Sequence, residues 1–260
     1  MGKLVDMFSQ ARRTQNSGGM GFLGKSKAET KPRAAALVVE LPTIEAGTIE
    51  STLKAGADGL LFRWDGKNSD ALAPLNDAAE AVKKDNESAT YGLQLAGGWE
   101  ALERTHFEEF KEAGIHYILL PLNAPARFLS MKVKDLELVV TVPMRDGELY
   151  PNFIRNLTAF DQIAAVQLDF KFDESLSDLS IEDILHYRAV REAVRFPAML
   201  DIPEDLSDEG AHTLAALGVQ AVVLQAGANA DKTEEQIKHI RELLEQIFQE
   251  EKDKTHMMQS

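Results

Sequence analysis

The chain has 260 residues, of which 44% are hydrophobic, and a formal net charge of −14 at pH 7. This hydrophobic content is enough for a large core, so the composition excludes a wholly disordered chain. The chain has no cysteine, which excludes disulfides, thiolate nucleophiles and thiolate metal sites. No apolar run approaches the ~20 residues that a membrane-spanning helix needs, and the first residues lack the apolar block of a secretory signal. We therefore expect a protein of the cytoplasm.

The first part of the chain differs in charge from the rest. Residues 1–33 hold seven Lys/Arg and two Asp/Glu, whereas residues 34–260 hold 21 and 40. The strong negative charge of residues 34–260 repels nucleic acid and anionic membranes, and we expect neither as a partner. Residues 4–11 have the apolar spacing of a short amphipathic helix, and the glycine-rich segment 17–24 lacks the context of a phosphate-binding loop. We predict that 1–33 is a flexible basic extension, a tether or a strap across the bottom of the folded domain; docking to a partner protein is the alternative.

From residue 34 onward, one unit repeats eight times: a short apolar run, a turn and a helical stretch such as 99–114 or 180–195. The apolar runs are 35–41, 59–64, 90–96, 116–122, 136–143, 163–172, 198–203 and 221–227. Alternating strands and helices imply a parallel sheet, and eight units in this length fit a closed barrel, which needs ~250 residues. We predict an α/β fold, a (β/α)8 barrel over 34–252 that folds without the extension, with a frayed tail over 253–260. An open doubly wound sheet is the alternative, but no glycine-rich dinucleotide turn follows the first strand.

Three joints between a helix and the next strand share one design. Gly56, Gly114 and Gly218 each follow a helical stretch and precede a buried run, where glycine suits the left-handed residue that ends a helix. In these joints the chain resembles the broad group of (β/α)8, or TIM, barrel metabolic enzymes, in which Ala-Gly-Ala-Asp before an apolar strand is common. The resemblance covers about residues 34–250. It implies the architecture, and no particular activity.

In nearly every predicted strand, the last side chain on one of the two faces is polar. The wholly apolar face must point towards the surrounding helices, so the other face points into the barrel. Its polar residues near the carboxyl ends are Glu40, Arg63, Gln94, Asn123, Thr141, Asp169, Lys171, Asp201 and Gln225. Barrel enzymes carry their active sites at this end. We expect a small-molecule site there, with Lys171, Asp169 and Glu40 as catalytic residues and the other six binding the substrate; a paired network that fills the barrel without catalysis is the alternative.

Lys171 is the candidate nucleophile. An interior lysine near Asp169 and Glu40 is suited to act as a Schiff-base nucleophile or general base if desolvation lowers its pKa. Its place at the end of the sixth strand is similar to that of the catalytic lysine in class I aldolases and Schiff-base dehydroquinases. Residues 63–65 are similar to the second-strand Arg-x-Asp of the latter, although Leu61 stands where their glutamate is expected and their histidine after strand five is missing. The resemblance implies a lyase-like lysine; a salt bridge to Asp169 or Glu40 is the alternative.

Metal and phosphate sites receive less support from the sequence. No His-x-His or Glu-x-x-His pair stands at a strand end, so a zinc or iron site is not expected. Glu40, Asp169 and Asp201 offer oxygen ligands for Mg²⁺ but come from distant strands. Glu204 and Asp205 disfavour a phosphate after the seventh strand.

We therefore expect no metal and no cofactor. The predicted function is a metal-independent barrel enzyme that acts on a small carboxylate or carbonyl metabolite, as a Schiff-base lyase or aldolase. A catalytically silent barrel that serves as a binding or structural module is the alternative. A protein partner and a homo-oligomer both stay open.

Overall fold

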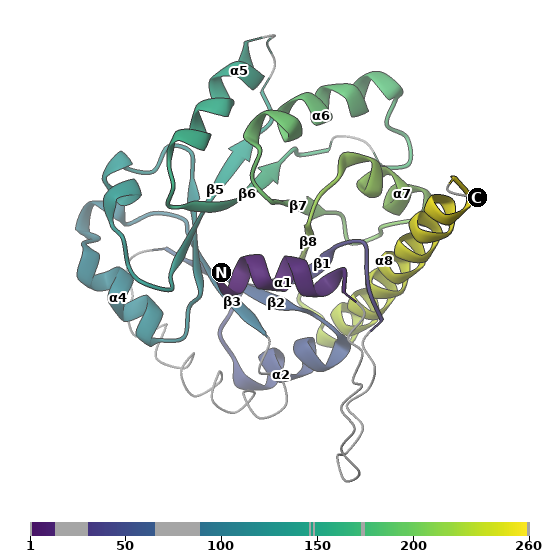
Figure 1. Cartoon of the computed structure of the whole chain (residues 1–260). Helices are drawn as coiled ribbons and strands as arrows, with labels where there is room; N and C mark the ends of the chain where they lie inside the picture. Colours follow the sequence, from purple (N-terminus) through teal and green to yellow (C-terminus); the bar gives the residue numbers. More distant parts are fainter. Residues whose placement is uncertain are drawn as a thin grey trace, which may run out of the picture.

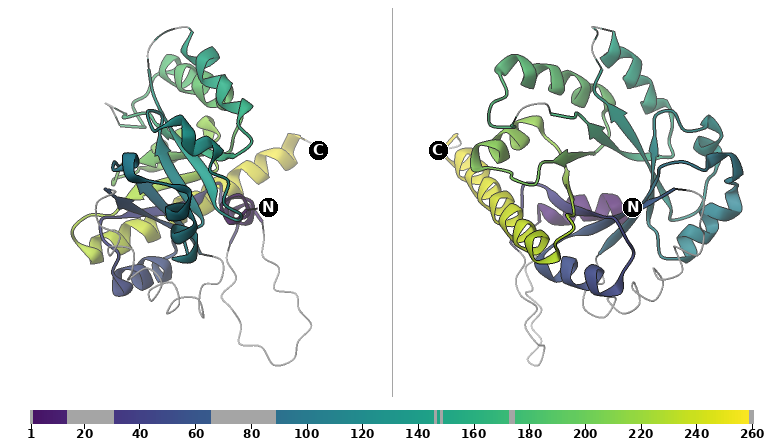
Figure 2. Two further views of the ribbon diagram at one scale, coloured as in Figure 1. Left: turned by 90° about the vertical axis from the view of Figure 1, so that its left-hand side faces the viewer. Right: turned by 180° about the vertical axis from the view of Figure 1, so that it is seen from behind.

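The computed structural model describes residues 2–13, 31–65, 89–145, 147, 149–172 and 175–258. Eight parallel strands pair in chain order and close into a barrel, with helices around it (Figures 1 and 2). The strands are β1 (Ala36–Leu41), β2 (Gly59–Trp64), β3 (Thr90–Leu95), β4 (Tyr117–Pro121), β5 (Glu137–Pro143), β6 (Ile163–Asp169), β7 (Ala198–Ile202) and β8 (Ala221–Gln225). All eight predicted runs are strands, and the prediction of a (β/α)8 barrel is confirmed.

Within the described residues, helical segments follow β1 and each of β3 to β8; residues 66–88, between β2 and β3, lie outside the described part of the chain. The helical segments are α2 (Ala46–Ala55), η2 (Trp99–Ala101), α4 (Arg104–Glu112), η3 (Ala126–Ser130), α5 (Tyr150–Ile154), η4 (Arg155–Ala159), α6 (Ile181–Val194), α7 (Asp208–Leu217) and α8 (Ala230–Met258), and α1 (Lys3–Ala11) precedes the barrel. Gly56, Gly114 and Gly218 have positive φ angles of 121°, 92° and 69°, as their position at helix ends requires. α8 runs six residues beyond position 252, so the expected frayed tail is helical as far as Met258. In the described part of the chain, no helix is long and apolar enough to cross a membrane.

The barrel has two hydrophobic cores. The larger one lies between the outer faces of the strands and the surrounding helices. The smaller one fills the barrel interior, and its strand residues are Ala36, Val38, Leu61, Tyr117, Leu119, Val139, Ala165, Met199, Ala221 and Val223. These residues belong to the face that sequence alternation assigned to the interior, because side chains of a strand alternate between its two sides.

α1 closes the amino end of the barrel. Leu4, Met7, Phe8 and Ala11 are buried in the inner core, and Figure 1 shows the helix lying across the barrel. At its start, the Leu4 backbone N–H donates to Glu137 Oε2 at 2.9 Å, from the first residue of β5. Residues 3–11 therefore form a strap packed against the barrel, not a free tether. Phe22 and Leu23 of the expected extension lie outside the described residues.

Candidate functional site

The inner face of the barrel turns polar towards the carboxyl ends of the strands, at the end opposite α1. In the register, Arg63 lies beside Gln94, Glu40 beside Gln225, and Thr141 beside Gln167. We call Glu40, Gln94, Tyr117, Gln167 and Asp201 the floor of this mouth, and Arg63, Thr141, Asp169 and Gln225 its rim. The floor residues are buried or half-buried, whereas Arg63 and Gln225 are exposed.

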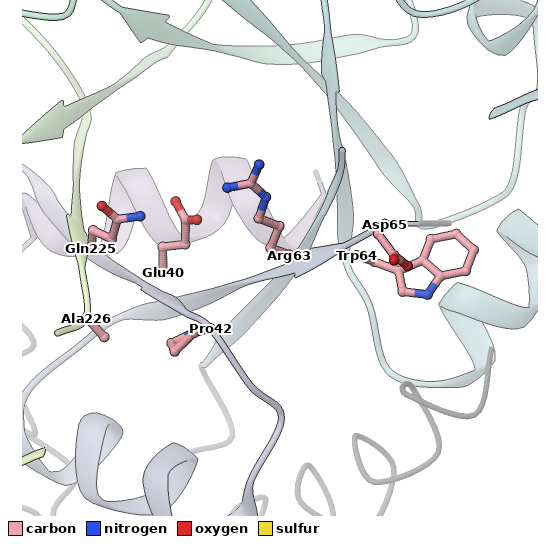
Figure 3. Close-up of a pocket in the computed structure, with 7 residues that line it drawn as sticks. All are labelled: Glu40, Pro42, Arg63, Trp64, Asp65, Gln225 and Ala226. Atoms are coloured by element: carbon pink, nitrogen blue, oxygen red, sulfur yellow. The ribbon is translucent and has the colours of Figure 1, made fainter. Parts of the chain in front are cut away.

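A cavity of ≈ 390 Å³ opens at one side of the mouth. Its lining residues are Glu40, Pro42, Arg63, Trp64, Asp65, Gln225 and Ala226. Figure 3 shows Glu40, Arg63 and Gln225 projecting to the same side from β1, β2 and β8, while the ring of Trp64 points away from them. An acid, a guanidinium and an amide therefore face one space of small-molecule size.

Asp201 on β7 carries the most altered acidity among the carboxyl groups of the mouth. Burial is the largest influence and raises the pKa of Asp201 to about 7, against the opposing hydrogen bond from Gln167. The negative charges of Glu40 and Asp169 raise the pKa of Asp201 further. Gln167 Nε2 donates this bond to Asp201 Oδ1. Near neutral pH, both protonation states of Asp201 are populated, as a group that transfers protons requires.

Glu40 on β1 is the second titrating group of the floor. Burial raises the pKa of Glu40, and the positive charge of Arg63 opposes this rise. Burial raises the pKa of Tyr117, as it does that of Asp201, and the charge of Glu40 raises both pKa values further. Glu40 is thus the residue that links the rim to the buried groups below it.

Tyr117 and Gln167 are floor residues that the sequence prediction omitted. Tyr117 begins β4 and is fully buried in the inner core. Its ring occupies space that Gly92 of β3 leaves open, because a Cβ at position 92 would overlap the Tyr117 ring. A glycine within a strand marks such a close approach. Gln167 lies on the same strand face as Ala165 and Asp169. The glycine and this alternation were therefore the sequence signals for Tyr117 and Gln167.

Three buried polar atoms of the floor have no hydrogen-bond partner among the described residues. They are Gln94 Oε1, Tyr117 OH and Gln167 Oε1. Buried polar atoms in proteins nearly always have a partner, from the protein, from water or from a ligand. These three atoms therefore need a partner that is either an ordered water molecule or a ligand.

Lys171 does not lie inside the barrel. β6 ends at Asp169, two residues earlier than its apolar run predicts, and Lys171 has a φ of 44°. Its side chain is 81% exposed, and its Nζ lies 3.9 Å from Asp169 Oδ2. The predicted interior position is wrong because no neighbouring strand encloses a residue beyond the end of the sheet. The salt bridge to Asp169, which was the alternative, is present.

The other predicted site residues separate into two groups. Glu40, Arg63, Gln94, Thr141, Asp169, Asp201 and Gln225 all lie on the inner face at the carboxyl end. Asn123 is exposed beyond the end of β4 and does not line the cavity. Within the described ranges, no three His, Cys, Asp or Glu side chains are grouped as metal ligands would be.

Comparisons with known proteins support the architecture. No family model matches this chain. No curated protein matches it either. Tryptophan synthase from Mycobacterium tuberculosis, in an open form with BRD0059 bound, is similar in structure, with a TM-score of 0.59, 12% identity and coverage of 82% of this chain and 93% of that one. The native KDPGal structure gives a TM-score of 0.58 at 12% identity, with coverage of 87% and 100%. At this identity the likeness concerns the fold alone: the chain is a (β/α)8 barrel.

Proposed function

We propose that this chain is a metal-independent enzyme that removes a proton next to the carboxylate or carbonyl group of a small metabolite, as lyases and aldolases do. The observation that supports this proposal is the Asp201 carboxyl group, whose pKa burial raises to about 7. An ordinary aspartate ionises well below neutral pH and is a weak base. A carboxylate with a pKa near the working pH is a far better proton acceptor.

Arg63 supplies the second requirement, which is a fixed substrate. Its exposed guanidinium faces the cavity on the same side as Glu40 (Figure 3). Guanidinium groups bind carboxylates through two parallel hydrogen bonds, which set the orientation as well as the position of the substrate. The proposal requires that the adjacent carbon of a small metabolite, with its carboxylate held at Arg63, reaches Asp201, which is close enough to Glu40 for their charges to interact.

Proton transfer by Asp201 accounts for the site better than imine formation at Lys171. An amine attacks a carbonyl group only when it is uncharged, which in barrel enzymes follows from desolvation or from a neighbouring cation. Lys171 is 81% exposed, so it is not desolvated, and the charged group beside it is the Asp169 carboxylate and not a cation. The expected Schiff-base chemistry therefore has no support from the position of this lysine.

A catalytically silent binding module is the second candidate. It is favoured by the pairing that already exists within the mouth: Gln167 with Asp201, and the charge of Glu40 with that of Arg63. A self-contained network would leave no polar atom without a partner, however, and the floor has three such atoms among its described residues. The silent module would therefore still need water or a ligand at these three atoms.

The test is hydrogen exchange at carbon. Small 2-oxo, 2-hydroxy and 2-amino acids would be incubated with the protein in D₂O, and deuterium at the carbon next to the carboxylate or carbonyl would be followed by NMR. We expect incorporation into one chemical class, faster as pH rises through about 7, where Asp201 becomes ionised. Asp201→Asn should abolish it, and Asp205→Asn, an exposed carboxylate of the following loop, should leave it unchanged. No incorporation with any class, or equal rates in Asp201→Asn, would refute the proposal.

A further inference from the structure

The unpartnered atoms of the floor share one property: each can accept a hydrogen bond. Gln94 and Gln167 present their carbonyl oxygens, and Tyr117 presents its hydroxyl oxygen. The amide nitrogen of Gln167 is already used by Asp201, so this side chain keeps only its acceptor. A molecule that satisfies the two amide oxygens must bring hydrogen-bond donors, whereas the Tyr117 hydroxyl can either donate or accept.

The carboxyl groups of the mouth favour a donor that carries a positive charge. Glu40, Asp169 and Asp201 carry carboxyl groups, and the charges of the first two are close enough to Asp201 to raise its pKa. Arg63 is the one cation whose charge acts on Glu40 among the described residues. An ammonium group brings three N–H donors together with a positive charge, whereas a hydroxyl or a water molecule brings donors without charge.

We propose that the mouth binds a free amino acid, with its ammonium group on the floor and its carboxylate at Arg63. This inference rests on the proposed function for the role of Arg63, and it names the substrate class. The cavity of ≈ 390 Å³ has a volume within the ~300–1,000 Å³ typical of small-molecule sites, and Glu40 is the floor residue that lines it, together with Arg63 of the rim. The two ends of the ligand are distinguished by charge: an acid-rich floor for the ammonium group and a guanidinium rim for the carboxylate.

The test compares ligands that differ in one group. Calorimetry would measure binding of L-phenylalanine, L-3-phenyllactate, 3-phenylpropionate and 2-phenylethylamine, and of a small set of L-alanine, L-lactate, propionate and ethylamine. In at least one set we expect the amino acid to bind about tenfold or more tightly than the hydroxy acid, and the compounds with a single group to bind most weakly. Equal affinity for the hydroxy acid, or no binding by either set, would overturn the inference.

Variants locate the two ends of the ligand. Gln94→Met keeps the length of the side chain and removes the acceptor, and it should weaken the amino acid about tenfold while leaving the simple carboxylate unchanged. Arg63→Met should reduce the amino acid to the affinity of the amine. Gln246→Met, at an exposed position on α8, is the control and should change neither. If Gln94→Met weakened the amino acid and the carboxylate equally, the ammonium group would not be on the floor.

The outcomes separate this inference from the proposed function. Selective binding of an amino acid without deuterium exchange would leave the inference standing and favour the silent module. Deuterium exchange confined to a 2-oxo or 2-hydroxy acid would support the enzyme and overturn the inference. The ligand comparison uses the unaltered protein, so it decides the question even if a floor variant does not fold.

Discussion

Replacement of Asp201 by asparagine should stabilise the protein at neutral pH while removing its activity. Asparagine has the same shape and accepts the same hydrogen bond from Gln167 Nε2. It cannot ionise, so it is free of the energetic penalty that burial imposes on the charged carboxylate. Functional groups held in such environments commonly lower stability.

The size and sign of the effect follow from the raised pKa. The pKa of Asp201 rises from 3.8 to about 7 on folding. Below about pH 4 the group is protonated in both the folded and the unfolded state and contributes nothing to the pH dependence. Between the two values only the unfolded state is ionised, so the stability of the native protein falls by about 1.4 kcal/mol per pH unit. Above pH 7 the loss is complete and amounts to about 4 kcal/mol, which is an upper bound because neighbouring groups relax.

Urea unfolding followed by circular dichroism across about pH 4 to 8 tests this reasoning. The free energy of unfolding of Asp201→Asn minus that of the unaltered protein should increase as pH rises and level off above about pH 7. Asp205→Asn, on the exposed loop after β7, should give a difference close to zero at every pH. A difference for Asp201→Asn that does not change with pH would refute the raised pKa and, with it, the assignment of Asp201 as the proton acceptor.

Three further substitutions test the fold around the site. Phe8→Ala should lower the free energy of unfolding by about 3–5 kcal/mol in urea titrations, because Phe8 is 5% exposed in the inner core; an unchanged midpoint would show that the strap is dispensable. Lys171→Met should change the free energy of unfolding by less than about 0.5 kcal/mol, since the side chain is 81% exposed. Borohydride treatment of the unaltered protein with 2-oxo acids should trap no imine at Lys171; a trapped imine at this residue would contradict its placement. Gly92→Ala should destabilise by about 1–3 kcal/mol through overlap with the Tyr117 ring, as measured by thermal melting, whereas Gly47→Ala, with nothing within 4 Å of the added carbon, should not.

Local sequence patterns were sufficient to predict the barrel. Each strand is a short apolar run because it is covered on both faces, by helices outside and by the inner core within. Glycines 56, 114 and 218 marked the ends of helices because their positive φ angles are strained for other residues. Alternation along β1, β2, β3 and β7 was also enough to place Glu40, Arg63, Gln94 and Asp201 at one end of the barrel.

The end of β6 shows where alternation stops being informative. Phe170 and Phe172 continue the apolar face, and both rings pack against Tyr187 of α6, at 4.7 and 5.1 Å between centroids. The sequence therefore looks like an uninterrupted strand as far as residue 172. Pairing with β5 ends at Asp169, however, and Lys171 lies in solvent. Apolar spacing reports which face a residue takes, but only contact with neighbouring strands determines whether the opposite face is enclosed.

The sequence by itself determined the number of strands, their order along the chain and the face on which most polar residues lie, because these depend on neighbours a few positions away. Only the tertiary structure decided what lies across the barrel from each residue. It brought Gly92 beside Tyr117, set α1 under the inner core, and buried Asp201 with Gln167 among the charges of β1 and β6. The acidity of Asp201 and the unpartnered acceptors of the floor arise from those long-range contacts, since desolvation and missing hydrogen-bond partners are properties of the enclosed space.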